Sequence, residues 1–485
     1  MKLYSFLLEN KTLKQTIFKN TFWLSFSEII ARFLKFILLI YVARILGATE
    51  YGRFSFALDL VAILIIFADL GTGTIITREL AKDLKKEKDY LHSLFSLRIF
   101  LTLFTLFLIN LIAIFITPDI KVKRVIFLLS FYGIFSSFFD FANSFFRARQ
   151  RMEYEAIGKI LNSVFCVGLG FLFLQKIPSI ITLSYAYLIG IFIATLSLFW
   201  ILQKKFIPFG FKIDKIIWKE FLSLSWPLAF IAIFASVYHY MDTVMLGAWG
   251  FMKETGWYNA AYRIIDILII PAILISLSFF PVTSKSFKIG EKEEKKKKIF
   301  LSQLSILTAL AIPLIMGGVV LAPQIINFLY GKEYRASILA LQILIITAGI
   351  IYLSHPFYRT LIAANLQKTI FWITFSGALL NMILNFLLIP KYTLYGAAVA
   401  TLISYFLVFL LYLIFLKKKT SLSPFNKKYH NILIVSLSAS LLMIFLISQI
   451  SVLIKLNIIL LILIGAIFYS VCIFLFNKIF KLELI

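Results

Sequence analysis

The sequence has few of the side chains that hold metals or form disulfide bonds. Only two cysteines, Cys166 and Cys472, occur in 485 residues, and both lie inside apolar runs that offer no metal-ligand spacing. The four histidines lack cysteine or carboxylate neighbours at ligand spacing, which disfavours a zinc or iron site. The phosphate-binding motif GxxxxGK(S/T) is also absent. We therefore expect no metal and no cofactor.

Long polar stretches are missing as well. Only 15% of the residues are charged and 61% are hydrophobic, well above the roughly 45–50% of an average soluble protein. The longest polar break covers roughly residues 285–298, and we expect no soluble domain. Membrane glycosyltransferases and polysaccharide polymerases usually need a sizeable external loop to hold an acceptor. The sequence has no room for such a loop, so we do not expect an enzyme.

Apolar segments of membrane-spanning length recur along the whole chain. Each reaches about the 17–25 residues that cross a hydrocarbon core about 30 Å thick. The strands of a membrane barrel would instead alternate over about 10 residues, a pattern that is absent here. The fold class that we predict is an all-α polytopic membrane protein with about fourteen transmembrane helices. We place them at 18–46, 52–71, 90–117, 124–146, 156–174, 179–202, 220–247, 257–284, 299–322, 337–358, 369–389, 394–416, 431–449 and 453–477.

The positive charge of the chain is distributed unevenly between alternate loops. The formal net charge is +26, which would suit a nucleic-acid partner if the charge were concentrated. Of the 49 lysines and arginines, 34 lie in one set of loops and tails, ten in the alternate loops and five inside spans. Positive residues favour the cytoplasmic side, so we expect a multi-pass protein of the cytoplasmic membrane with both termini in the cytoplasm. Anionic membrane lipids are a sufficient partner for these loops, and we expect no nucleic acid.

Weak self-similarity relates the two halves at a spacing near 200 residues. The stretch LGATEYGRFSFA (46–57) is similar to LGAWGFMKETGWYNAA (246–261), and RARQRMEYEAIGKILN (147–162) is more faintly similar to AANLQKTIFWITFSGA (363–378). Repeated halves with a site between them are typical of transporters. The alternative is chance, since glycine and aromatic residues are common at helix ends. The repeat predicts an N-terminal lobe (1–205), a C-terminal lobe (206–420) and two additional helices (421–485).

Several short blocks carry a resemblance to a known group. They are LGATEYGRFSFA (46–57), DLGTGTIITREL (69–80), FFRARQRMEYEAIGKI (145–160), YMDTVMLGAWG (240–250), TGWYNAAYRI (255–264), LYGKEYRAS (329–337) and the region 361–401. The chain resembles the polysaccharide-export (Wzx-like) flippases of the multidrug/oligosaccharidyl-lipid/polysaccharide superfamily. The resemblance implies a two-lobed, V-shaped bundle that flips a lipid-linked oligosaccharide by alternating access. Polysaccharide assembly proteins are the protein partners that we would expect. Relatives in this superfamily include drug antiporters and lipid II flippases.

The first span carries three ionisable residues on nearly one helical face. Glu28, Arg32 and Lys35 are separated by steps of four and three residues, in a segment where a charge costs about 2.5–3.5 kcal/mol on the insertion scale. Arg32 and Lys35, together with Arg98 and Arg263, are the residues that we expect to line a cationic cavity for a diphosphate or an acidic sugar. The alternatives are a structural Glu28–Arg32 pair, with Lys35 bonded to carbonyl groups, and an Arg98 side chain that reaches the cytoplasmic face.

Four carboxylates are candidates for coupling or gating. Asp59 is the first of them, because a buried carboxylate can bind a coupling proton or sodium ion. Its alternative role is an ion pair with Arg32 or Lys35. The other three are Glu28, Asp242 and Asp266. For Asp242, and for the cation Arg263, the sequence is equally compatible with a role in an outer gate and with simple capping of a helix end.

These observations favour a flippase for a polyprenyl-diphosphate-linked oligosaccharide, such as a polysaccharide repeat unit. A cation-coupled multidrug antiporter is the main alternative, but it would need a more acidic cavity than Arg32 and Lys35 provide. A glycosyltransferase or polymerase lacks its external loop. A scaffold without transport would not need the charges inside the spans.

Overall fold

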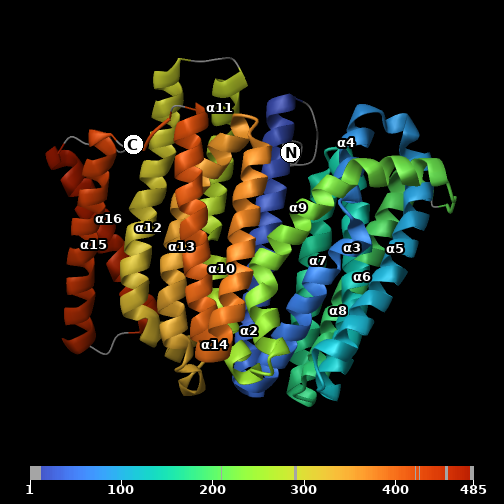
Figure 1. Cartoon of the computed structure of the whole chain (residues 1–485), viewed down its shortest axis with the longest axis horizontal. Helices are drawn as coiled ribbons and strands as arrows, with labels where there is room; N and C mark the ends of the chain where they lie inside the picture. Colours follow the sequence, from blue (N-terminus) through green and yellow to red (C-terminus); the bar gives the residue numbers. More distant parts are fainter. Residues whose placement is uncertain are drawn as a thin grey trace, which may run out of the picture. The chain divides into compact units, whose positions relative to one another are not determined.

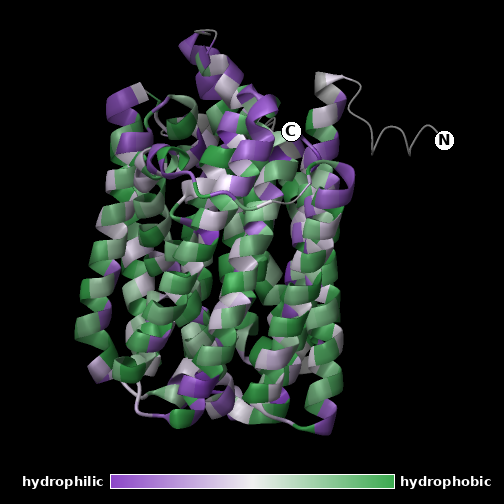
Figure 2. Cartoon of the chain, turned by 90° about the vertical axis from the view of Figure 1, so that its right-hand side faces the viewer, coloured by the Kyte–Doolittle hydropathy of each residue, from purple (hydrophilic) through white to green (hydrophobic). Residues whose placement is uncertain are grey.

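The computed structural model describes residues 12–208, 210–288, 292–420, 422–424, 426–453 and 457–480. All regular secondary structure within these residues is helical, as predicted (Figure 1). Figure 2 shows hydrophobic residues along most of each helix and hydrophilic residues gathered toward the helix ends, the pattern expected of helices that cross a bilayer. The helices form two compact units, Met1–Gly256 and Trp257–Ile485.

The first unit contains eight of the described α-helices and the start of a ninth. Its order is α2 (Leu13–Leu64), α3 (Ile66–Asp69), α4 (Thr72–Lys82), a 3-10 turn (Leu84–Lys86), α5 (Glu87–Ile116), α6 (Ile120–Ala148), α7 (Met152–Lys176), α8 (Ile180–Lys205) and α9 (Lys215–Ala248). Side-chain caps define several of these starts: Asp119 caps α6, Ser179 caps α8 and Asp214 caps α9.

The second unit continues from α10, whose first turn belongs to the first unit. Its order is α10 (Met252–Leu268), α11 (Ile270–Lys288), α12 (Glu293–Leu329), a 3-10 turn (Lys332–Tyr334), α13 (Ser337–Ala363), α14 (Gln367–Thr420), α15 (Lys427–Leu453) and α16 (Ile458–Phe480). Within this unit α12 packs on α13 and α15, α13 packs on α14, and α15 packs on α16.

Two helices are too long for a single span, and each contains a kink. The 52-residue α2 has a non-helical residue at Gly47 (φ 75°, ψ 171°), and the 54-residue α14 has one at Thr393 (φ 49°, ψ −124°). A positive φ is free of steric cost at glycine, which suits the first position. Eleven described helices are long and apolar enough to cross a membrane, or twelve with the bent pair Gln15–Asp69 and Thr72–Lys82.

The fourteen predicted spans exceed these twelve candidates by two. The two helical arms of α2 correspond to the predicted segments 18–46 and 52–71, and those of α14 to 369–389 and 394–416. The bounds of the other helices follow the predicted segments to within several residues. In the last predicted segment, 453–477, residues 454–456 lie outside the described part of the chain.

A second interruption follows the kink of α2. Leu70 (φ 49°) and Gly71 (φ 75°) are both left-handed, so α3 ends there and α4 starts at a bend of 42°. A side chain at Gly71 would be disfavoured for two reasons. The positive φ is strained for other residues, and an added Cβ would lie 3.0 Å from the carbonyl oxygen of Ser225. This broken helix is held by polar contacts that are described below.

Four helices of the first unit, α2, α6, α7 and α8, pack closely on one another. Small residues allow this approach: a Cβ at Gly170 would lie 2.8 Å from the Leu38 side chain, and one at Gly190 would lie 2.8 Å from the backbone nitrogen of Cys166. The close packing brings polar residues of all but α8 together around one cavity.

Candidate functional site

A cavity of about 230 Å³ lies among these four helices. Sites that enclose a whole drug-sized ligand measure about 300–1,000 Å³, so this one suits a single charged group of a larger molecule. Three cationic and two acidic side chains line it, a formal excess of one positive charge. The lining residues are Glu28, Ala31, Arg32 and Lys35 of α2, Ser136, Phe139 and Asp140 of α6, Lys159, Asn162 and Ser163 of α7, and Ile191 of α8.

Glu28 joins two of the cations from different helices. Its Oε1 accepts a hydrogen bond from Arg32 Nε at 2.7 Å, and its Oε2 accepts one from Lys159 Nζ at 3.2 Å. The side chains of Glu28 and Arg32 are 42% and 39% exposed, so both reach the open part of the cavity. The expected local Glu28–Arg32 pair is therefore present, and it is extended by a contact to α7.

Lys35 has a different environment from the other two cations. Its ammonium group forms a side-chain hydrogen bond with Tyr132 and lies near the thiol of Cys166. Among the described residues Lys35 forms no ion pair with a carboxylate. Its ammonium group lines the cavity, where Glu28 attracts it electrostatically without forming an ion pair.

An ion-pair chain runs from the cavity to the end of α6. Lys159 Nζ also lies 3.2 Å from Glu155 Oε1, and Glu155 receives two hydrogen bonds from Arg147, both at 2.7 Å. Two parallel contacts between a guanidinium and a carboxylate hold both groups in a fixed geometry. The order Arg147–Glu155–Lys159–Glu28–Arg32 therefore alternates in sign across α6, α7 and α2.

Helix α6 contributes the second carboxylate of the cavity. The Asp140 side chain is exposed to the cavity, and it makes no ion pair with another described residue. Asn162 and Ser163 lie beside Lys159 on α7 and are buried. The cavity therefore offers hydrogen-bond donors and acceptors as well as positive charge.

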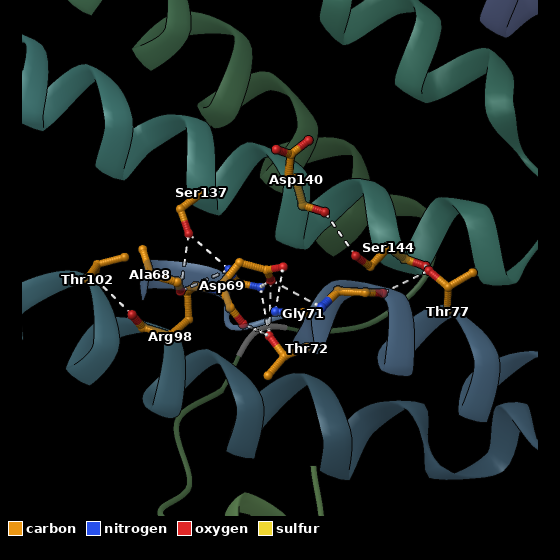
Figure 3. A network of polar contacts seen from close by, with 11 residues as sticks. Ala68, Asp69, Gly71, Thr72, Thr77, Arg98, Thr102, Ser137, Asp140 and Ser144 are labelled. Carbon is orange, nitrogen blue, oxygen red and sulfur yellow. Dashed lines mark hydrogen bonds and ion pairs between the residues drawn. The ribbon is translucent and has the colours of Figure 1, made fainter. Parts of the chain in front are cut away.

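Arg98 lies outside this lining and instead holds the break between α3 and α4 (Figure 3). Its side chain is 1% exposed. The guanidinium donates to the carbonyl oxygen of Ala68 at 3.0 Å and to Ser137 Oγ at 2.9 Å, and it lies 2.5 Å from Asp69 Oδ1. Figure 3 shows Arg98 directed at Ala68 and Asp69, the last two residues of α3. Its contacts therefore favour a positioning role over substrate binding.

Asp69, the last residue of α3, completes this network. Its carboxylate accepts hydrogen bonds from the backbone N–H groups of Gly71 and Gly73, both at 3.1 Å, and from Thr72 Oγ1. These contacts satisfy the N–H groups of Gly71, which precedes α4, and of Gly73 in its first turn. We refer to Asp69, Arg98 and Ser137, with the backbone that they bind, as the break clasp.

Helix α6 connects the break clasp to the cavity. Ser137 binds Arg98, and the carbonyl oxygen of Ser144 accepts a hydrogen bond from Thr77 of α4 at 3.2 Å. Ser136 and Asp140 of the same helix line the cavity. In Figure 3 the Asp140 carboxylate points away from Asp69.

The remaining predicted residues lie elsewhere. Asp59 on α2 and Asp242 on α9 are buried, with 3% and 2% exposure, and neither is among the described residues that line the cavity. In the second unit, Arg263 Nη1 lies 3.2 Å from Asp266 Oδ2 within α10. Among the described residues no group of three or more His, Cys, Asp or Glu side chains could hold a metal ion.

Sequence reasoning missed two of the five ionisable residues of the cavity, Lys159 and Asp140. Lys159 counts among the loop cations in the charge distribution, although it falls inside the predicted span 156–174. The spacing of four residues between Glu155 and Lys159 was the available signal, since it places both on one face of a helix. Asp140 gave no comparable signal, because no cationic residue lies three or four positions from it in the sequence.

The chain matches two family models. Residues 17–287 match the family described as "Polysaccharide biosynthesis protein", and residues 227–387 match MatE. The first match covers more than half of the chain and includes all residues of the cavity.

Curated relatives and solved structures agree with these matches. The chain is 25% identical to the "probable low-salt glycan biosynthesis flippase Agl15" of Haloferax volcanii over 385 residues, 77% of either chain. It is 33% identical to the "probable flippase AglR" of the same organism over 172 residues, 34% of this chain and 35% of that one. The fold is similar to that of the lipid II flippase MurJ in an inward closed conformation. That comparison has a TM-score of 0.79 and 18% identity, and it covers 94% of this chain and 99% of the other.

Proposed function

Because the chain belongs to the polysaccharide biosynthesis protein family, a group of multi-pass membrane transporters rather than enzymes, we propose that it flips a glycan linked to a polyprenyl diphosphate. The family makes it a probable flippase of glycan or polysaccharide biosynthesis within the multidrug/oligosaccharidyl-lipid/polysaccharide superfamily. The diphosphate carrier and the route through a cationic cavity are our proposal.

The observation that carries the proposal is the set of three cations in one intramembrane cavity. Arg32, Lys35 and Lys159 come from two apolar helices and converge on one space. Ionisable residues inside membrane segments are expensive and commonly mark the path of a substrate. A phosphate group in a medium of low dielectric constant needs cationic donors, and Arg can bind it with two parallel hydrogen bonds.

The size of the cavity fits a division of the substrate into two parts. The charged group would enter the cavity, while the polyprenyl tail would stay in the lipid.

We propose fourteen spans with both termini in the cytoplasm. They form two lobes (1–205 and 206–420) and two further helices (421–485), and the protein works by alternating access. We propose Asp59 and Asp242 as the carboxylates that couple transport to H⁺ or Na⁺, since both are buried in apolar helices. Arg263 and Asp266 then form a gating pair.

Surface glycan export tests the proposal. Arg32→Ala and Lys35→Ala should each abolish export while the protein reaches the membrane at a normal level, because each removes a cation from the cavity. Lys82→Ala is the matched control, since the Lys82 side chain is 62% exposed and lies outside the cavity. Export at the wild-type level by both cavity variants would contradict the cationic-cavity assignment.

A cation-coupled drug antiporter is the second candidate. The MatE match over residues 227–387 and the Asp140 carboxylate in the cavity favour it. An antiporter predicts efflux of a cationic dye such as ethidium from cells that express the chain, and loss of that efflux in Asp140→Asn. The flippase proposal predicts no dye efflux in either case.

A further inference from the structure

Glu28 takes up the space between two of the cavity's cations. Its two carboxylate oxygens receive hydrogen bonds from Arg32 and Lys159, at 2.7 Å and 3.2 Å. A carboxylate bound in this way offers the same chemistry as two adjacent oxygens of a phosphate group. The chain thus places an anion of its own where the proposed substrate would place one.

We propose that Glu28 is an internal competitor of the anionic head group, which binds by displacing the Glu28 carboxylate from Arg32 and Lys159. This inference rests on the proposed function. The exchange replaces two charge-assisted hydrogen bonds with two of the same kind, so it contributes little net affinity. A flippase must release the head group on the far side of the membrane, and a competitor inside the site makes that release easier.

The contacts of Lys159 decide which side chain moves in this exchange. Lys159 keeps Glu155 as a partner when Glu28 leaves, and Glu155 is itself held by two hydrogen bonds from Arg147. Lys159 therefore stays in place on α7, whereas Glu28 loses its contact with that helix. Binding of a head group breaks the ion pair between α2 and α7, and release restores it.

Lys35 supplies the first attraction in this scheme. It forms no ion pair with any described carboxylate, so an incoming anion can approach it without displacing another group. Its position one helical turn from Arg32 on α2 then brings the anion next to Glu28.

Binding of inorganic diphosphate to the purified full-length protein tests the inference. We compare wild type with Glu28→Gln by isothermal titration calorimetry, because glutamine keeps the shape of the side chain and removes its charge. Glu28→Gln should bind diphosphate about tenfold more tightly, the change expected when a competing charge-assisted hydrogen bond is lost. Glu79→Gln is the matched control: Glu79 also pairs with two cations, Arg78 and Lys82, but lies outside the cavity, so its loss should leave affinity unchanged.

The outcomes separate this inference from the proposed function. Wild-type binding that depends on Arg32 and Lys35, with no gain in Glu28→Gln, would overturn the competitor role and leave the flippase proposal standing. Absence of binding in every variant would overturn both.

Glu28→Asp keeps the test decisive if the glutamine variant does not fold. Its shorter side chain cannot span Arg32 and Lys159 together, so diphosphate affinity should rise by about threefold, part of the full effect. An affinity equal to that of wild type would contradict the inference.

Discussion

The Arg98 guanidinium of α5 lies 2.5 Å from Asp69 Oδ1 at the break between α3 and α4, although 28 residues separate the two in the sequence. Arg98 also donates to the Ala68 carbonyl oxygen, which has lost its helical partner at the break. One side chain therefore neutralises the carboxylate that binds the first turn of α4, and it also donates to the backbone at the end of α3. The position of the break follows from this pairing as well as from Gly71.

Arg98→Ala should destabilise the protein rather than weaken a substrate contact. It removes the charged partner of Asp69 and leaves the Ala68 carbonyl oxygen with only the longer 3.4 Å contact from Ser137 Oγ. We expect a loss of about 2–3 kcal/mol, below the 3–5 kcal/mol of a fully buried pair because Asp69 is partly exposed. Thermal unfolding in detergent and the amount of protein in the membrane measure this loss. Normal stability combined with lost glycan export would instead support the substrate-binding role predicted from the sequence.

Gly52→Ala should prevent normal folding. An added Cβ at Gly52 would lie 1.8 Å from the carbonyl oxygen of Met252, and one at Gly256 would lie 1.9 Å from that of Ala48. Backbone atoms at such distances must move apart. Gly168→Ala is the control, because a Cβ there has no atom within 4 Å in the described structure. Expression and thermal unfolding should be impaired in the first variant and unchanged in the control. Equal behaviour would contradict the close crossing of these two segments.

Lys159→Ala should impair glycan export as strongly as Arg32→Ala, at least about tenfold, since each removes one charge-assisted contact to the head group. Lys205→Ala serves as its control, because Lys205 contacts Tyr154 outside the cavity. Quantifying surface glycan at equal protein level measures both. Unimpaired export in Lys159→Ala would contradict its role in binding the head group and would support its original grouping with the cations of the loops.

Asp214 should stabilise the start of α9 in a pH-dependent way. The backbone N–H of Ile217, joined by that of Ile216, holds the pKa of the Asp214 carboxyl below its ordinary value. A carboxyl whose pKa is lowered on folding contributes stability above its unfolded pKa of about 3.9 and loses it as the pH falls through the folded value. The protection factors of the amides of residues 216 and 217, which compare the observed exchange rate with the intrinsic rate at the same pH, should therefore be high at neutral pH and fall under acid.

Asp214→Asn provides the comparison for that measurement. Asparagine still accepts a hydrogen bond from the backbone but does not titrate in this range. Protection at residues 216 and 217 should then become independent of acid. The same acid-induced loss in the asparagine variant would show that another group controls the start of α9.

The helices could be predicted from the sequence because each depends on its own run of apolar residues. The kinks at Gly47 and Thr393 lie between segments that hydropathy had already separated. The Glu28–Arg32 pair was equally accessible, since a spacing of four residues places both on one helical face.

The tertiary partners could not be read in this way. The contact of Glu28 with Lys159 joins residues 131 positions apart, and only the packing of α2 on α7 brings them together. Arg98 illustrates the same limit, because its sequence neighbours do not reveal that it meets Asp69. The broken helix did leave a signal, the Asp69-Leu70-Gly71 stretch, in which a capping residue precedes a glycine.

The two faces of α6 restrict how this protein can change its substrate. Ser136 and Ser137 differ by only about 100° around the helix axis, yet one lines the cavity and the other binds Arg98. A substitution that rotates or shifts α6 to reshape the cavity also disturbs the support of the broken helix. Helix α8 contributes only Ile191 to the described lining, and this residue is buried in the same hydrophobic cluster as Ile75 and Ile76 of α4. A change of cargo made through either helix should therefore be accompanied by a measurable change in the stability of the broken helix.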